Sequence, residues 1–357
     1  MKPPTRDTIK KVIEIFKEKD RKRREFIEKF GHIKPPTVVK DANGKTVSAL
    51  ENGIYFQAAE QDYNFSNVIH DHALIFFGDA FLTMEESKAF EDRHPAIQWL
   101  HTVCAHDEKI FKMDGVHHDR KRIGLHAAWL RFANDLFTIR DNSRLEALLK
   151  KRLMKSAKFQ GARHELRVAA LCIAAGFKVE FEDDMDNSSL HPEFIAVDKF
   201  SSIRVAVEAK SRHRRGVLGF SEGPDEVPGE SVKIKNLVLS AYKKQTGLPL
   251  YVFIDVNLPP ASVEFEDQRW LGEILDTMME LASKGYTDPC PANAIFFCND
   301  PSHFITDRPL NDVTDHLWIK HFTAEVPRID HPNSAIVERF MKAYTQRVAG
   351  PDAIDFC

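Results

Sequence analysis

The chain has 357 residues, of which 43% are hydrophobic and 29% charged, with a formal net charge of −3 at pH 7. This balance excludes a protein coated in positive charge for nonspecific nucleic-acid binding, but it leaves room for a local basic groove. No apolar run reaches the roughly 18 residues that span a bilayer, and no secretory leader is recognisable. The five cysteines lack the spacing of a zinc knuckle or a disulfide framework. We therefore expect a cytoplasmic protein.

The first 155 residues are expected to combine helices with a small β-meander. Residues 6–30 predict an amphipathic helix that ends at Gly31, and the acids among its bases favour a solvated charged face over a basic arm. Asn-Gly pairs at 43–44 and 52–53 interrupt β-prone runs, as in an antiparallel meander with tight turns. Between about 65 and 155, apolar residues recur at three and four, which predicts several helices. Pro95 suits the first turn of one of them.

A different pattern begins near residue 158. A helix that ends at Gly176 precedes three strand candidates, "FKVEFED", "PEFIAVD" and "IRVAVEAK". The helix "SVKIKNLVLSAYKKQTG" and the buried strand "PLYVFIDV" follow, which gives the order αβββαβ. A further helix, the strand "NAIFFCND" and a C-terminal helix from about Asn333 complete the chain. We expect an α/β core over 156–300 and a C-terminal extension over 301–357.

Charged side chains gather on two of these strands. Alternation places Glu208 and Lys210 on one face of "IRVAVEAK", and Glu193 begins the preceding strand. If the two strands are neighbours, two carboxylates and an ammonium group converge. Hard cations such as Mg²⁺ bind through one or two carboxylates plus water and substrate phosphate, and such a cation activates water for phosphodiester hydrolysis. The sequence therefore predicts an Mg²⁺ or Mn²⁺ site with Glu193 and Glu208 as ligands.

Glu165 on the preceding helix is a candidate fourth member. It shares a helical face with the apolar Val168, Ala169 and Cys172. A buried carboxylate needs a partner, which a metal-bound water or Lys210 would supply. The alternative is a surface glutamate that reaches solvent or Arg163, and the sequence leaves both open.

Together, Glu165 on a helix, "PEF" on the second strand and "VEAK" on the third resemble the PD-(D/E)xK nuclease superfamily over about residues 160–256. The resemblance implies a restriction-endonuclease-like mixed sheet flanked by helices, and metal-dependent cleavage of phosphodiesters. It assigns Glu193 to the place of the family's aspartate and Glu208 to that of the second acidic ligand. Lys210 becomes the catalytic lysine and Glu165 the helical acid.

Glu193 departs from the family pattern, in which aspartate is usual, and Mg²⁺ demands near-ideal geometry. The strand can adjust, or Asp198 or Asp186 can substitute. In the third alternative the site is inactive, and the nuclease-like fold acts as a nucleic-acid- or protein-binding module.

Arginines follow the lysine directly in "SRHRRG". Arg212, Arg214 and Arg215 suit contacts with phosphate oxygens, although a solvated loop would also contain them. Lys233, Lys243 and Lys244 could extend such a basic rim or be ordinary surface lysines. The expected partner is nucleic acid, with DNA favoured, and the helices after residue 266 could serve a homodimer.

Other residues give weaker evidence of a functional site. His70 and His72 are two apart on a predicted helix and so point in different directions, which argues against a metal site. Aromatic residues at helical spacing are expected in the core rather than on a base-stacking surface: Trp99, Trp129, Phe132 and Phe137.

Overall fold

The protein is described by a computed structural model, in which a mixed α/β architecture is seen over most of the chain. The described residues are 6–34, 37–40, 46–49, 55–57, 65–114, 123–180, 191–222, 232–244, 246–260, 269–310, 315, 317–331 and 334–345. Within them, no helix is both long and apolar enough to cross a membrane.

The N-terminal region has the expected helices and meander. Helix α1 ends at Phe30, and Gly31 follows with a φ of 76° that favours glycine. The meander strands pair in the antiparallel order β1-β2-β3, while the predicted Asn-Gly turns lie outside the described residues. Pro95 is the first residue of α4, as predicted. The elements are α1 (Arg6–Phe30), β1 (Thr37–Lys40), β2 (Thr46–Ala49), β3 (Tyr55–Gln57), α2 (Phe65–Phe77), α3 (Asp79–Glu86), α4 (Pro95–Asp114), α5 (Gly124–Ile139) and α6 (Ser143–Leu153).

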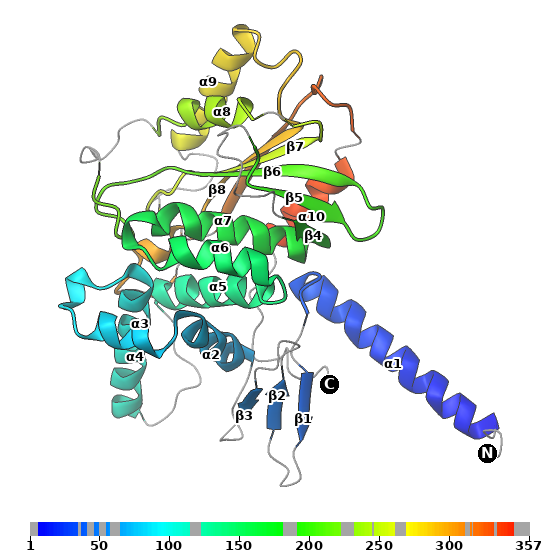
Figure 1. Ribbon diagram of the computed structural model, residues 1–357, viewed down its shortest axis with the longest axis vertical. Helices are drawn as coiled ribbons and strands as arrows, with labels where there is room; N and C mark the ends of the chain where they lie inside the picture. Colours follow the sequence, from blue (N-terminus) through cyan, green and yellow to red (C-terminus); the bar gives the residue numbers. More distant parts are fainter. Residues whose placement is uncertain are drawn as a thin grey trace.

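A six-stranded mixed sheet forms the centre of the second half (Figure 1). Its order is β4-β5-β6-β7-β8-β9, with β5 antiparallel to both neighbours, β6, β7 and β8 parallel, and β9 antiparallel at the edge. The predicted order αβββαβ is observed from α7 to β7. The elements are α7 (Ser156–Ala174), β4 (Phe177–Glu180), β5 (Phe194–Asp198), β6 (Arg204–Ser211), α8 (Lys235–Tyr242), β7 (Leu250–Asp255), α9 (Arg269–Ser283), β8 (Ala294–Asn299), β9 (Trp318–Thr323) and α10 (Ser334–Thr345).

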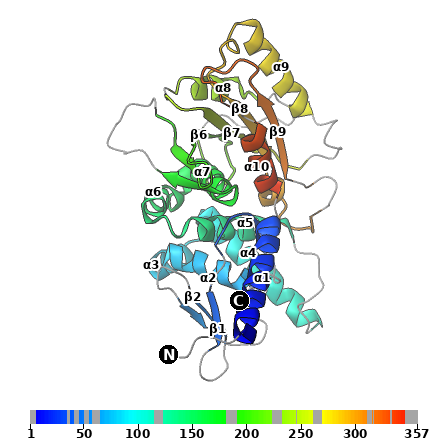
Figure 2. The same cartoon turned by 90° about the vertical axis from the view of Figure 1, so that its right-hand side faces the viewer.

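Helices cover both faces of this sheet, as Figures 1 and 2 show. Residues Val205, Val207 and Ala209 of β6 join the core on the face of α7 and α10. Ala206 points to the opposite face, which packs beneath α8 and α9. Strands buried on both faces read as continuous apolar runs, which explains why β7 and β8 were recognisable from sequence.

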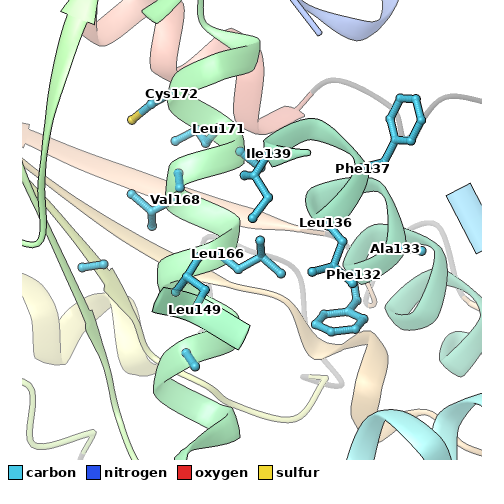
Figure 3. Packing of buried hydrophobic residues seen from close by; sticks show 14 of the residues in the cluster. Phe132, Ala133, Leu136, Phe137, Ile139, Leu149, Leu166, Val168, Leu171 and Cys172 are labelled. Carbon is cyan, nitrogen blue, oxygen red and sulfur yellow. The ribbon is translucent and has the colours of Figure 1, made fainter. Parts of the chain in front are cut away.

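Helix α5 connects the helical region to the sheet through α7 (Figure 3). Phe132, Leu136 and Ile139 of α5 are fully or almost fully buried, as is Leu166 of α7. The four aromatic residues expected in the core are indeed buried: Trp99, Trp129, Phe132 and Phe137. One continuous apolar cluster therefore connects the helical region with one face of the sheet.

Two elements differ from the sequence prediction. Helix α8 is limited to Lys235–Tyr242, since Lys233 lies at a positive φ of 51° and prevents an earlier helical start. Strand β9 was not predicted, because its half-exposed residues do not form an apolar run. It extends the central sheet beyond β8, and α10 packs against α7. The segment after residue 300 therefore contributes to the same core.

Candidate active site

Strand β6 carries Glu208 and Lys210 on the face expected from the alternation. The Glu208 side chain is fully buried, with 0% exposure, because it continues the inward-facing row begun by Ala206. Lys210 stands two residues later and remains 21% exposed. Its Nζ lies 2.5 Å from Oε1 of Glu208, so the buried carboxylate has a direct counter-ion.

The pairing of β5 with β6 brings Glu193 to the same place. Phe194 is the register partner of Val207, so Glu193 lies beside Glu208. The backbone N–H of Glu193 donates to Oε2 of Glu208 at 3.2 Å, and its carboxylate Oε1 lies 3.8 Å from Nζ of Lys210. The three residues singled out from two separate strands therefore form one cluster.

Lys244 is a further member of this cluster, and sequence reasoning placed it only among candidate rim residues. It follows α8, yet its side chain is only 12% exposed. Its Nζ donates to the carbonyl oxygen of His191 at 2.6 Å and lies 3.4 Å from Oε1 of Glu208. Lys243, by contrast, is exposed. No signal in the sequence distinguishes these two neighbouring lysines.

Glu165 of α7 is paired with a residue that the sequence did not indicate. Both of its carboxylate oxygens contact Arg152 of α6, and the Nη1–Oε1 distance is 2.8 Å. The suggested partner Arg163 instead lies 3.6 Å from Asp255 of β7, on another side of α7. Arg152 ends the basic run "LLKKRL", and only the packing of α6 on α7 brings it to Glu165.

Burial and neighbouring charges change the proton affinity of these groups. Burial, followed by the charge of Glu193, raises the pKa of Glu165 to about 8, against the opposing effect of Arg152. Burial likewise raises the pKa of Glu208, although Lys210 opposes it. For Lys210, burial lowers the pKa, but the charges of Glu208, Glu193 and Glu165 outweigh it, and the net shift is upward. The carboxylates and the lysine therefore act electrostatically as one group.

The oxygen donors of the cluster meet part of what a divalent cation needs. Across the described part of the chain, no three or more His, Cys, Asp or Glu side chains are arranged as a metal-holding group. Glu193 and Glu208 supply two carboxylates, which suffices for Mg²⁺ when water and substrate phosphate complete its coordination. Oε1 of Glu208 is contacted by Nζ of Lys210 at 2.5 Å and by Nζ of Lys244 at 3.4 Å, so a bound cation would share this oxygen with the two lysines. The two glutamates fit a cation of this kind.

The alternative prediction that Asp198 replaces Glu193 as a metal ligand is wrong. Asp198 lies at the opposite end of β5 from Glu193, and five residues of extended chain span about 16 Å. Its carboxylate accepts from Nη1 of Arg339 at 2.7 Å and from the backbone N–H of Phe200 at 2.9 Å. Asp186, the other alternative, lies outside the described residues.

The arginines after β6 differ in their surroundings. Arg214 is half-buried, with Nη1 donating to the carbonyl oxygen of Asn257 at 3.1 Å and its guanidinium 5.4 Å from the Phe304 ring centre. Arg212 is also half-buried, whereas Arg215 is exposed. Exposure alone therefore makes Arg215 the most accessible of the three to a nucleic acid.

A second polar cluster, which the sequence did not indicate, lies where β7 and β8 end. Three arginine–aspartate pairs line a small cavity of about 30 Å³. Burial raises the pKa of Asp135 to about 6, against the opposing charge of Arg167. A space of this size holds water rather than an organic ligand. The pairs are Arg131–Asp300 at 2.7 Å, Arg167–Asp135 at 2.9 Å and Arg163–Asp255 at 3.6 Å.

Comparisons with family models, curated proteins and solved structures found no significant match to this chain.

Proposed function

We propose that this protein is a divalent-metal-dependent nuclease that hydrolyses phosphodiester bonds of nucleic acid, with DNA as the favoured substrate. The observation that carries the proposal is the convergence of Glu193, Glu208 and Lys210 from adjacent strands. A mixed sheet with the order αβββαβ supports it, since the resemblance to PD-(D/E)xK nucleases implies that arrangement.

The side chains have complementary roles in this reaction. Glu193 and Glu208 would hold Mg²⁺ or Mn²⁺, which when bound supplies Lewis acidity and a water of lowered pKa. As the water oxygen bonds to phosphorus and the ester P–O bond breaks, negative charge accumulates on the phosphoryl oxygens. The Lys210 ammonium group, held near both carboxylates, stabilises that charge. Glu165 would support the site from the neighbouring helix α7, since its pKa depends on the charges of Glu193, Lys210 and Glu208.

The surroundings favour a polyanionic substrate. Lys210 is partly exposed, and the exposed Arg215 lies five residues beyond it in the chain. Arginine matches phosphate oxygens with its planar fork, so the segment after β6 would contact the backbone next to the cleaved bond.

The second candidate function is a nuclease-like module that binds nucleic acid or protein without cleaving it. One observation favours it: Lys210 and Lys244 already neutralise the buried Glu208. A cation would have to displace or share these contacts, and Glu193 carries a longer side chain than the aspartate usual in the family.

Cleavage assays separate the two candidates. Supercoiled plasmid and labelled single strands are incubated with the protein and Mg²⁺ or Mn²⁺, and with chelator as the blank. The nuclease hypothesis predicts nicked or shortened products. We expect rates at least about 100-fold lower in Lys210→Met, which loses a group that acts on the transition state, and in Glu208→Gln, which loses a ligand of the cation.

Lys178→Met is the matched control, because Lys178 of β4 is 69% exposed and its ion pair with Glu180 lies at the surface. This variant should cleave like the wild type. Metal-independent cleavage, or equal cleavage by Lys210→Met, would contradict the nuclease. Nucleic-acid binding without any cleavage would favour the second candidate.

A further inference from the structure

Lys244 connects two parts of the site that are distant in sequence. Its Nζ donates to the carbonyl oxygen of His191 at 2.6 Å, two residues before Glu193, and lies 3.4 Å from the buried carboxylate of Glu208. A lysine that follows a helix ordinarily extends into solvent, because its charge is strongly hydrated. This one is 12% exposed and turned inward. Its ammonium group has therefore lost much of its hydration, and the contacts with β5 and β6 offset that loss of free energy.

With Lys244 included, the charges in contact around Glu193 and Glu208 are balanced. Glu193 and Glu208 contribute two negative charges, and Lys210 and Lys244 contribute two positive charges within contact distance. A divalent cation that binds to this arrangement meets two ammonium groups at short range. Charges at such distances interact strongly where solvent is largely excluded. In the free site, both ammonium groups therefore repel a cation, and additional negative charge would reduce that repulsion.

We propose that Lys244 is a positioning residue that fixes Glu208 and opposes cation binding in the absence of substrate. A phosphodiester supplies the missing negative charge, so cation and substrate strengthen each other's binding. This inference rests on the proposed nuclease function and adds an order to it: the metal is held firmly only once the nucleic acid is in place. By thermodynamic linkage, the nucleic acid is then also bound more tightly when the cation is present.

Mn²⁺ binding by the free protein tests the inference without reference to cleavage. Calorimetric titrations compare the wild type with Lys244→Met, Lys244→Gln and Lys244→Arg. Removal of the charge should tighten Mn²⁺ binding by roughly tenfold, because one repelling charge near the cation is lost. Lys244→Arg should remain close to the wild type. A lysine with a merely structural role would weaken metal binding or leave it unchanged when removed.

The matched control is Lys235→Met, at the opposite end of α8, where the lysine is paired with Glu280 in a partly exposed contact. Far-ultraviolet circular dichroism checks folding, and Lys244→Gln serves if Lys244→Met does not fold. Equal Mn²⁺ affinities in wild type, Lys244→Gln and Lys235→Met would overturn the role of Lys244 while leaving the nuclease intact. An absence of Mn²⁺ binding in every variant of the free protein would overturn the role of Lys244, whereas the nuclease is tested separately by the cleavage assay.

Discussion

Glu165 is the acid of the site whose pKa is shifted most. It lies on α7 beside Arg152 and near three other charged groups of the site. Burial and the charge of Glu193 raise its pKa to about 8 in the folded protein. In the unfolded chain a glutamate titrates near 4.3. The folded state therefore keeps a proton between about pH 4.5 and pH 8 that the unfolded state has released.

This difference gives a pH-dependent prediction. Because the native state binds more protons in this window, the free energy of unfolding falls as pH rises from about 4.5 to 8, by up to about 1.4 kcal/mol per pH unit. Glu165→Gln removes this contribution. Urea unfolding is measured in chelator-treated protein. As pH rises from about 4.5 to 8, the free energy of unfolding of Glu165→Gln should increase relative to that of the wild type. Parallel pH profiles would contradict the raised pKa.

At the scale of elements, Arg339 connects α10 to the sheet. It donates from Nη1 to Asp198 of β5 at 2.7 Å and from Nε to the carbonyl oxygen of Ala175 at 2.8 Å. Its guanidinium also lies 4.4 Å from the ring centre of Phe177 on β4. One side chain of α10 thus contacts the end of α7 and the two strands that precede β6.

We expect Arg339→Met to lower the free energy of unfolding by about 2–4 kcal/mol, because it leaves the buried carboxylate of Asp198 without its counter-ion. Burial alone would raise the pKa of Asp198, but hydrogen bonds from Arg339, Phe200 and Ser201 lower it overall. The stabilisation is therefore present above pH 4 and is lost as pH falls through the folded-state pKa. Urea titrations at neutral and acidic pH should show the difference from wild type shrink in acid.

Arg204→Met is the control for this measurement. Its ion pair with Glu180 has 55% and 36% exposed side chains and a 3.6 Å separation, so its loss should cost less than about 0.5 kcal/mol. Equal effects of the two substitutions would show that Arg339 has no special role.

The sequence was informative where a pattern is local. Alternation in "IRVAVEAK" placed Glu208 and Lys210 on one face, and the apolar runs predicted β7 and β8. Contacts between elements were not predictable, because nothing in the chain around Arg152 or Lys244 marks its distant partner. Strand β9 was missed for a related reason: an edge strand with half-exposed residues lacks the apolar run of a buried one. Its identity as a strand depends on β8.

For the molecule as a whole, the last described segments complete the core. Strand β9 pairs with β8 through six residues, and Phe340 of α10 is fully buried among aromatic rings of the sheet, 5.4 Å between ring centres from Phe253. Removal of these segments would expose both the edge of β8 and one face of the sheet. The helical region is likewise joined to the sheet through α5 and α7.

A chain that ends at residue 310 should therefore fail to fold into a soluble monomer. The physical reason is the exposed strand edge together with lost aromatic packing. Size-exclusion chromatography and circular dichroism would detect aggregation or loss of the cooperative thermal transition. A chain that lacks residues 1–19 is the control, since the described side chains from Ile13 to Lys19 are exposed. If the chain ending at 310 unfolds like the wild type, residues 1–310 form a stable core without β9 and α10.

The graded exposure of the site has one more consequence. Glu193 is 23% exposed while Glu208 is completely enclosed, although the two glutamates are joined by a hydrogen bond. A water-soluble carbodiimide with an amine should therefore derivatise Glu193 and spare its neighbour. A reagent that approaches from solvent therefore meets Lys210 and Glu193 first, and Glu208 lies behind them.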